Sequence, residues 1–205
     1  MNNPTRPAVA VFDGLLRAIH WWNALSITGL LATGLAAEEF EHGPLPSALW
    51  QWHISLGYAL IGGLAARLLW GLVGPATARW TDLWHPAAWR EIFRTRQLPK
   101  PRAGHDPLAS LAFIGLYLTL ASIAATGLAL AAIEYERGPL AAWSGDAAWL
   151  KEAFKEPHEA LYLVVAGFVG LHLAALVFHA WRGHSVAGAM IGGDLHVDAG
   201  EVRHA

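Results

Sequence analysis

The chain contains no cysteine and carries little charge. The absence of thiols excludes disulfides, thiolate-bound zinc, iron–sulfur clusters and the C-x-x-C-H motif that attaches haem covalently. Charged residues make up 15% of the 205 positions, whereas a soluble domain carries about 25%. The net charge of −2 offers no basic surface, so we expect no nucleic acid partner. A hydrophobic chain of this kind is typical of a small membrane protein.

The chain contains several long apolar segments. Four segments reach the length of about 20 residues that a transmembrane helix needs: residues 15–37, 52–73, 107–133 and 158–181. None shows the strong alternation of a barrel strand, and a single segment in lipid satisfies its backbone hydrogen bonds as a helix. The sequence therefore predicts an all-α, integral membrane four-helix bundle, with residues 1–205 forming a single domain.

Basic residues predict the orientation of these segments. The connection between the second and third segments carries Arg79, Arg90, Arg94, Arg96, Lys100 and Arg102. The connection after the first segment carries Glu38, Glu39 and Glu41 and no basic residue. Because basic loops stay in the cytoplasm, both termini are predicted to be cytoplasmic, with residues 182–205 as a cytoplasmic tail.

Residues 80–96, in the basic connection, predict a helix on the membrane surface. The apolar side chains expected to enter the lipid interface are Trp80, Leu83 and Trp84, and the arginines expected to meet anionic head groups are Arg90, Arg94 and Arg96. His85 is also expected at this interface. Membrane lipids are therefore a predicted partner.

Five of the eleven histidines lie in or at the ends of the apolar segments: His20, His53, His158, His172 and His179. Ionisable side chains in a membrane are costly and indicate functional sites. His158 and His172 are 14 residues apart, which places them on one helix face about 21 Å from each other. With alternating helix directions, His53 and His158 come together near the outer surface, and His20 and His172 come together in the inner half.

Two histidine pairs at two depths predict two non-covalent haem groups. One imidazole on each side of a flat ring satisfies a b-type haem with no other ligand type. Zinc is the rival, but a tetrahedral site needs more ligands than two histidines, and no carboxylate lies in the middle of a segment. We therefore expect two haem b groups, which would carry electrons across the membrane.

Two arginines accompany the predicted haem ligands. Arg67 is 14 residues after His53 and shares its helix face, and Arg17 lies one turn before His20. Each arginine either pairs with a haem propionate or extends to the cytoplasmic interface.

His179 lies seven residues beyond His172, on nearly the same face of the helix. A titratable donor at this depth could bind a quinone carbonyl and transfer protons; the alternative is an interfacial histidine with no such partner. Trp181 and Arg182 would border the quinone site.

Four stretches resemble one family of membrane cytochromes. They read RAIHWWNALSITGLLATG, HISLGYALIGGLAARLLWGLVGP, GHDPLAS and HEALYLVVAGFVGLHLAALVFHAWRG. They resemble bacterial cytochrome b561 and the b-type cytochrome subunit of nickel–iron hydrogenases, and the resemblance extends over residues 12–192. Asp106 stands where the family usually has Asn, and we expect no fifth helix of the kind common in hydrogenase subunits.

The resemblance implies a bacterial inner-membrane cytochrome with two b haems, ligated by His20 with His172 and by His53 with His158. It also indicates His179 as the residue that approaches a quinone. The implied function is electron transfer between quinone and a periplasmic redox protein, either a c-type cytochrome or a dehydrogenase. Two alternatives are a superoxide:quinone oxidoreductase, which would be an enzyme, and a non-redox carrier of haem or metal lined by histidines.

Overall fold

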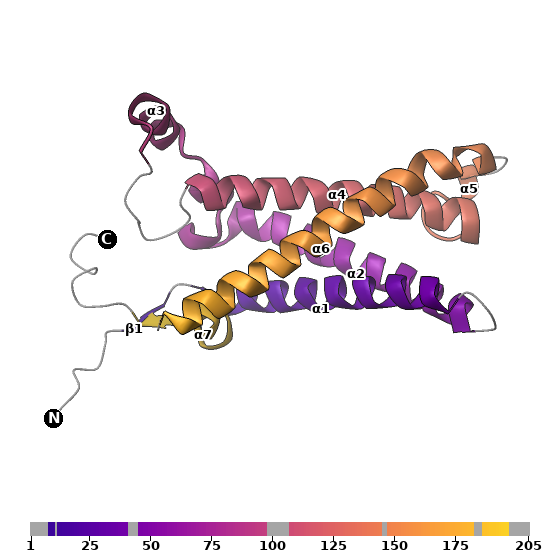
Figure 1. Ribbon diagram of the computed structural model, residues 1–205, viewed down its shortest axis with the longest axis horizontal. Helices are drawn as coiled ribbons and strands as arrows, with labels where there is room; N and C mark the ends of the chain where they lie inside the picture. The colour runs from indigo at the N-terminus through magenta and orange to yellow at the C-terminus, as the bar shows by residue number, and fades with distance from the viewer. Residues whose placement is uncertain are drawn as a thin grey trace. The chain divides into compact units, whose positions relative to one another are not determined.

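The computed structural model describes residues 8–10, 12–40, 45–97, 107–144, 147–182 and 186–196. Its long helices are α1 (Gly14–Glu39), α2 (Leu45–Val73), α4 (Pro107–Tyr135) and α6 (Lys151–Trp181), as labelled in Figure 1. The shorter described elements are β1 (Ala8–Ala10), η1 (Ala76–Ala78), η2 (Trp80–Leu83), α3 (Pro86–Thr95), α5 (Ala141–Ser144), η3 (Ala147–Leu150), α7 (Val186–Gly192) and β2 (Asp194–His196). Apart from one short ribbon of two strands, the described part of the chain is helical, which confirms the all-α class.

Local capping chemistry explains where two of the long helices begin. α1 starts after Asp13, whose Oδ1 accepts a hydrogen bond from the backbone N–H of Leu16 at 2.9 Å, as an N-cap carboxylate does. α4 starts at Pro107, where a missing N–H leaves no helical hydrogen bond unmade. Asp106, which departs from the family's usual Asn, lies outside the described residues.

α6 begins earlier than the sequence predicts. It starts at Lys151 instead of residue 158 and contains Pro157. Proline removes one helical hydrogen bond, but the charged residues around it favour helix. Lys155 Nζ lies 3.7 Å from Glu159 Oε1, one turn further along, and an opposite-charge pair at this spacing adds a small stabilisation to a helix.

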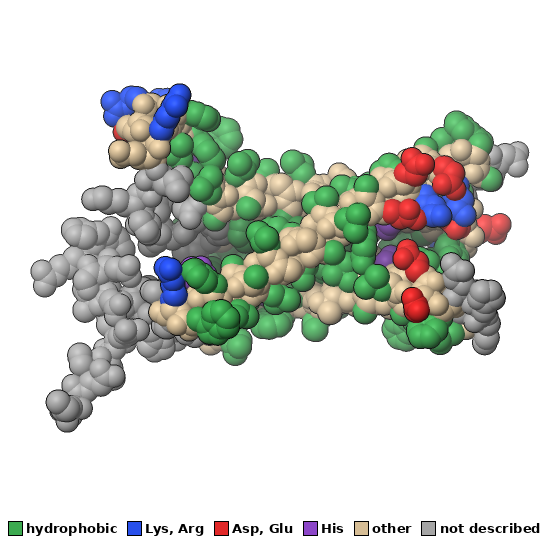
Figure 2. Space-filling model, viewed as in Figure 1, with side chains coloured by type: hydrophobic (Ala, Val, Ile, Leu, Met, Phe, Trp, Pro, Cys, Tyr) green, Lys and Arg blue, Asp and Glu red, His purple; other side chains and the backbone are tan. Residues whose placement is uncertain are grey.

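Three of the described helices are long and apolar enough to cross a membrane, within Ser47–Val73, Pro107–Tyr135 and Ala148–Trp181. α1 has 26 residues but is not among them. Its sequence HWWN at residues 20–23 has polar and interfacial side chains where the other helices have aliphatic ones, which lowers its mean hydropathy. The length of α1, but not its hydropathy, therefore supports the predicted fourth span. Large apolar side chains such as Leu118 and Leu171 point outward, as the green surface in Figure 2 shows, and lipid would cover them.

The chain forms two compact units. The first comprises Met1–His20, Ala66–Ile114 and His172–Ala205, and the second comprises Trp21–Ala65 and Gly115–Leu171. The second unit has an aliphatic core to which all four long helices contribute. Leu60 and Leu64 of α2 pack with Leu120 of α4 and Val165 of α6, and Ile27 and Leu30 of α1 lie against them.

In the first unit, the beginning and the end of the described chain are joined. β1 pairs antiparallel with β2, with Ala8 opposite His196. Ala189 of α7 is fully buried, and an Arg17 Nη1 donates to the carbonyl of Ile191. Residues 182–205, predicted as a tail, therefore contain a helix and a strand that pack against the start of α1.

The predicted surface helix over residues 80–96 is shorter in the structure and starts at Pro86. Leu83 is buried, and Trp80 donates from Nε1 to the carbonyl of Leu68 at 3.0 Å, so these two side chains do not point away into an interface as predicted. Trp84 is 75% exposed, as the prediction requires. Proline at the first helical position starts the helix because it has the required φ and needs no hydrogen bond there.

Candidate functional site

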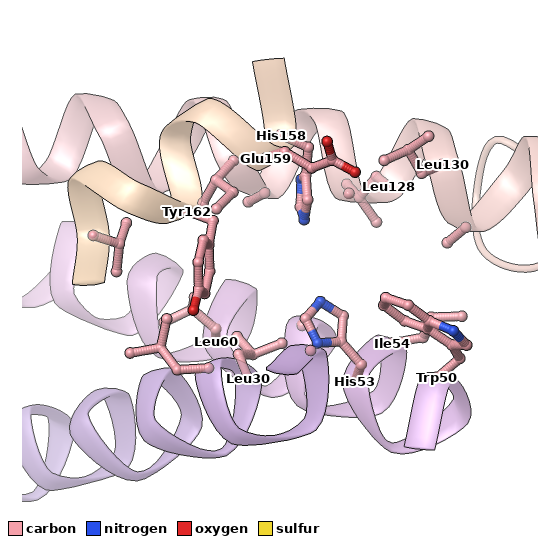
Figure 3. A pocket seen from close by; sticks show the side chains of 18 of the residues that line it. Leu30, Trp50, His53, Ile54, Leu60, Leu128, Leu130, His158, Glu159 and Tyr162 are labelled. Atoms are coloured by element: carbon pink, nitrogen blue, oxygen red, sulfur yellow. The ribbon is translucent and has the colours of Figure 1, made fainter. Parts of the chain in front are cut away.

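In the second unit, His53 of α2 and His158 of α6 point toward each other across a cavity (Figure 3). Their ring centroids are 6.4 Å apart, and the ring planes are inclined at 69°. The cavity measures about 570 Å³, and its aliphatic walls include Leu30, Leu60 and Leu128. This volume lies in the range of small-molecule and cofactor sites, about 300–1,000 Å³.

Charged side chains also line this cavity, from α4 and the beginning of α6. Lys151 Nζ lies 3.3 Å from Glu134 Oε2, and Lys155 lies beside Glu159. Figure 2 shows acidic and basic side chains gathered at this end of the unit. The site thus combines apolar walls, which suit a flat apolar ring, with a charged mouth in which each lysine lies beside a carboxylate.

Each of the two histidines contacts a threonine on the neighbouring helix. Thr33 Oγ1 of α1 lies 3.2 Å from His53 Nδ1, and Thr126 Oγ1 of α4 lies 2.9 Å from His158 Nδ1. Neither threonine is among the site residues predicted from the sequence. A signal for both exists, because the pentapeptide ATGLA occurs at residues 32–36 and again at residues 125–129.

The first unit contains the other predicted pair. The ring centroids of His20 on α1 and His172 on α6 are 6.4 Å apart, with the planes inclined at 58°. His20 is half-buried, whereas His172 is exposed. Among the described residues, no group of three or more histidine and acidic side chains gathers as a metal site, so each pair offers two imidazoles.

The two predicted propionate partners lie in the first unit. Arg67 is buried, and its guanidinium carbon lies 4.6 Å from the ring centroid of Trp80, in cation–π contact. Arg17 donates to the Ile191 carbonyl, while its Nε is buried with no hydrogen-bond partner in the described part of the chain. A buried nitrogen without a hydrogen-bond acceptor destabilises the folded protein. An acidic group of a ligand would supply that acceptor.

The three predicted quinone-site residues lie at the end of α6. His179 and Arg182 are exposed, and Trp181 is 85% exposed. Phe178 contacts two of them: its ring centroid lies 5.9 Å from that of His179, and the Arg182 guanidinium lies over its ring. The quinone role of these side chains stays a prediction.

His85 differs from its predicted position. It is only 6% exposed, and its Nε2 lies 2.9 Å from Oγ of the buried Ser110 on α4. The expectation of an interfacial histidine is therefore wrong. The hydrogen bond explains the burial, because a polar ring is tolerated inside a protein when it has a partner.

Comparison with known proteins decides the family. The family model described as prokaryotic cytochrome b561 matches residues 11–193, which include all four long helices and both histidine pairs. The chain belongs to the prokaryotic cytochrome b561 family. As a member, it is an integral membrane b-type cytochrome of electron transport, and the resemblance seen in the sequence is confirmed.

Three relatives illustrate the range within this cytochrome b561 family. The "Probable Ni/Fe-hydrogenase B-type cytochrome subunit" of Azotobacter chroococcum mcd 1 is 30% identical over 91% of this chain and 88% of its own length. The protein of the same name from Rhodobacter capsulatus is 34% identical over 61% of this chain and 55% of its own. The "Probable Ni/Fe-hydrogenase 1 B-type cytochrome subunit" of Escherichia coli K12 is 29% identical over 58% of this chain and 59% of its own. No solved structure matches the chain.

The family implies haem b, and the spacing of the imidazoles fits that group. A metal–imidazole bond is about 2.0–2.1 Å and the ring centre lies about 1.1 Å behind the nitrogen, so two imidazoles that bind one metal from opposite sides have centroids about 6.2–6.4 Å apart. Both pairs in this cytochrome have a centroid separation of 6.4 Å. The spacing of each pair therefore fits two imidazoles that would share one haem iron.

Proposed function

We propose that the chain is a two-haem b-type cytochrome that transfers electrons between a quinone near the cytoplasmic face and a redox protein on the periplasmic face. The observation that carries this proposal is the pair of equal imidazole separations, 6.4 Å for His20 with His172 and 6.4 Å for His53 with His158. Bound haem supplies reversible one-electron exchange at the iron. The four histidines would hold the two irons, and the apolar helix walls would exclude water.

The proposed topology has four membrane spans, with α1 as the first and both termini in the cytoplasm. α1 carries His20 and Thr33, two polar side chains at the proposed ligand sites, and such side chains contribute to its lower hydropathy. The basic residues around α3 lie on the cytoplasmic side under the positive-inside rule. The His53–His158 site then belongs to the periplasmic half, and the His20–His172 site belongs to the cytoplasmic half.

Arg17 and Arg67 are proposed to neutralise propionates of the haem between His20 and His172. Arg17 has a buried Nε that lacks an acceptor in the described residues, and Arg67 supplies a buried positive charge. A carboxylate would satisfy the Arg17 nitrogen in a charge-assisted hydrogen bond, which is stronger than a neutral one.

The proposed periplasmic partner is a redox enzyme or a c-type cytochrome, and the names of the relatives favour a nickel–iron hydrogenase among them. The charged mouth near the His53–His158 site suits docking more than capture of a small anion. Lys151 and Lys155 each lie beside a carboxylate, so they attract superoxide weakly.

The ligand assignment is tested by haem quantitation on the purified full chain. Wild type is expected to bind two haems, and each of His20→Ala, His172→Ala, His53→Ala and His158→Ala is expected to bind one. Double variants decide the pairing: His20→Ala with His172→Ala keeps one haem, whereas His20→Ala with His53→Ala keeps none. Two haems in every single variant would overturn the proposal.

The quinone site is tested by reducing the haems with a quinol and, separately, with dithionite. His179→Ala is expected to slow reduction by quinol at least tenfold, while dithionite reduces the same fraction of haem as in wild type. Haem content serves as the control for folding. Quinol reduction at the wild-type rate would remove His179 from the proposed quinone site.

A further inference from the structure

We infer that Thr33 and Thr126 are a matched pair of positioning residues that set the tautomer and the ring orientation of His53 and His158. This inference rests on the proposed function, because it concerns the side chains proposed to hold the haem of the second unit. Two hydroxyl groups on two different helices contact the same atom, Nδ1, of the two histidines.

The single proton of each hydroxyl is already committed to a backbone carbonyl. Thr33 Oγ1 donates to the Gly29 carbonyl at 2.7 Å. Thr126 Oγ1 lies 3.0 Å from the Ile123 carbonyl and 3.1 Å from the Ser122 carbonyl. A hydroxyl has one proton and two lone pairs, so toward histidine each threonine oxygen is an acceptor.

The tautomer of the histidines follows from this count. Nδ1 must carry the proton that it donates to threonine, which leaves the lone pair on Nε2. A metal-bound histidine needs its ligating nitrogen unprotonated and its other nitrogen hydrogen-bonded. Both imidazoles thus present Nε2 as the nitrogen that would ligate iron.

The repeated sequence ATGLA provides room for this arrangement on both sides of the site. The glycine after each threonine lies against the same histidine: a Cβ at Gly34 would stand 3.5 Å from His53 Cε1, and one at Gly127 would stand 3.1 Å from His158 Cε1. The Thr-Gly dipeptide therefore provides both the acceptor and the space for the ring edge. The dipeptide on α1 contacts His53 of α2, and the dipeptide on α4 contacts His158 of α6.

A hydroxyl acceptor at Nδ1 makes the imidazole a stronger electron donor to iron. Stronger donation favours ferric over ferrous haem, so loss of the hydroxyl is expected to raise the midpoint potential. Outer ligand contacts are worth about 10- to 100-fold in metal affinity. If the ferric state is weakened by about tenfold relative to the ferrous state, the potential rises by about 59 mV.

The test compares Thr33→Val and Thr126→Val with Thr33→Ser and Thr126→Ser in the haem-loaded full chain. Valine keeps the shape and removes the oxygen, whereas serine keeps the oxygen. Redox titration is expected to show one of the two haems raised by about 59 mV in each valine variant, and the low-spin ferric EPR signal of that haem is expected to move as its imidazole rotates. Both serine variants are expected to restore the wild-type values.

Thr119→Val is the matched control. Thr119 lies on α4 and donates to the Gly115 carbonyl at 2.9 Å, and none of its hydrogen bonds within the described chain reaches a histidine. This variant is expected to leave potentials and EPR signals unchanged. An equal shift in Thr119→Val, or a valine effect that serine does not restore, would overturn the inference.

The outcome also separates this inference from the proposed function. If His53→Ala and His158→Ala each lose one haem while both valine variants keep wild-type potentials and EPR signals, the threonine role is wrong and the ligand assignment stands. If the two histidine variants keep both haems, the ligand assignment itself is wrong. Should a valine variant fail to assemble, Thr33→Ala and Thr126→Ala provide the same loss of oxygen without the β-branch.

Discussion

The imidazole ring centroids of His53 and His158 lie 6.4 Å apart on two different helices. The Nδ1 atom of each ring contacts a threonine hydroxyl on another helix, on α1 for His53 and on α4 for His158. All four long helices thus take part in positioning one pair of side chains. Rotation of any one helix would disturb this site, because the contacts behind the ligands orient them. This dependence leads to specific expectations for substitutions around the pair.

Replacing the glycines beside the histidines should have unequal effects. Gly127→Ala would place its methyl 3.1 Å from His158 Cε1, whereas Gly34→Ala would place it 3.5 Å from His53 Cε1. We expect Gly127→Ala to lower the haem content per chain and Gly34→Ala to keep nearly the wild-type content, because only the shorter distance forces the imidazole to move. Gly115→Ala is the control, since its added methyl meets open space. Equal haem loss in the variants at 34 and 127 would contradict the stated contacts.

The buried His85–Ser110 hydrogen bond should stabilise the connection between α2 and α4. Ser110→Ala leaves the His85 Nε2 without this partner, and such a loss costs about 1–3 kcal/mol in the free energy of unfolding. Unfolding in detergent, followed by circular dichroism, measures this change. A double-mutant cycle with His85→Phe isolates the pair, and a coupling energy near zero would argue that the bond contributes nothing.

The cysteine-free sequence makes the topology testable with single thiols. Gln97→Cys, after α3, and Ala142→Cys, in α5, each introduce the only thiol in the chain, and both positions are exposed. In intact cells, a membrane-impermeant maleimide is expected to label position 142 and to leave position 97 unlabelled until the membrane is opened. The reverse pattern would place the termini in the periplasm.

α3 is expected to lie on a lipid surface. Phe93 is 78% exposed and stacks with Trp89, while Arg94 lies on the charged side of the helix with Glu91. A polarity-sensitive fluorophore on Phe93→Cys should shift to shorter wavelength in nanodiscs that contain anionic lipid, because that face enters the interface. The same fluorophore on Arg94→Cys should report water. Identical spectra at both positions would exclude this orientation.

Helical geometry makes several features readable without a structure. The spacing of 14 residues between His158 and His172 places both on one helix face, and the apolar lengths of α2, α4 and α6 indicate membrane spans. The resemblance to the cytochrome b561 family follows from the order of the motifs, and the family comparison confirms it. These properties depend on distance along one chain segment, so the order of residues is sufficient.

Contacts between distant segments were decided only by the tertiary structure. Thr33 and Thr126 gain their role from the rotation of α1 and α4 against the histidine helices. Arg17 donates a hydrogen bond to a carbonyl 174 residues away. The burial of His85 is tolerated because its ring forms a hydrogen bond with Ser110. No local pattern specifies such partners, because they depend on how the packed helices are rotated about their axes. They also depend on which buried polar groups still need a hydrogen-bond partner.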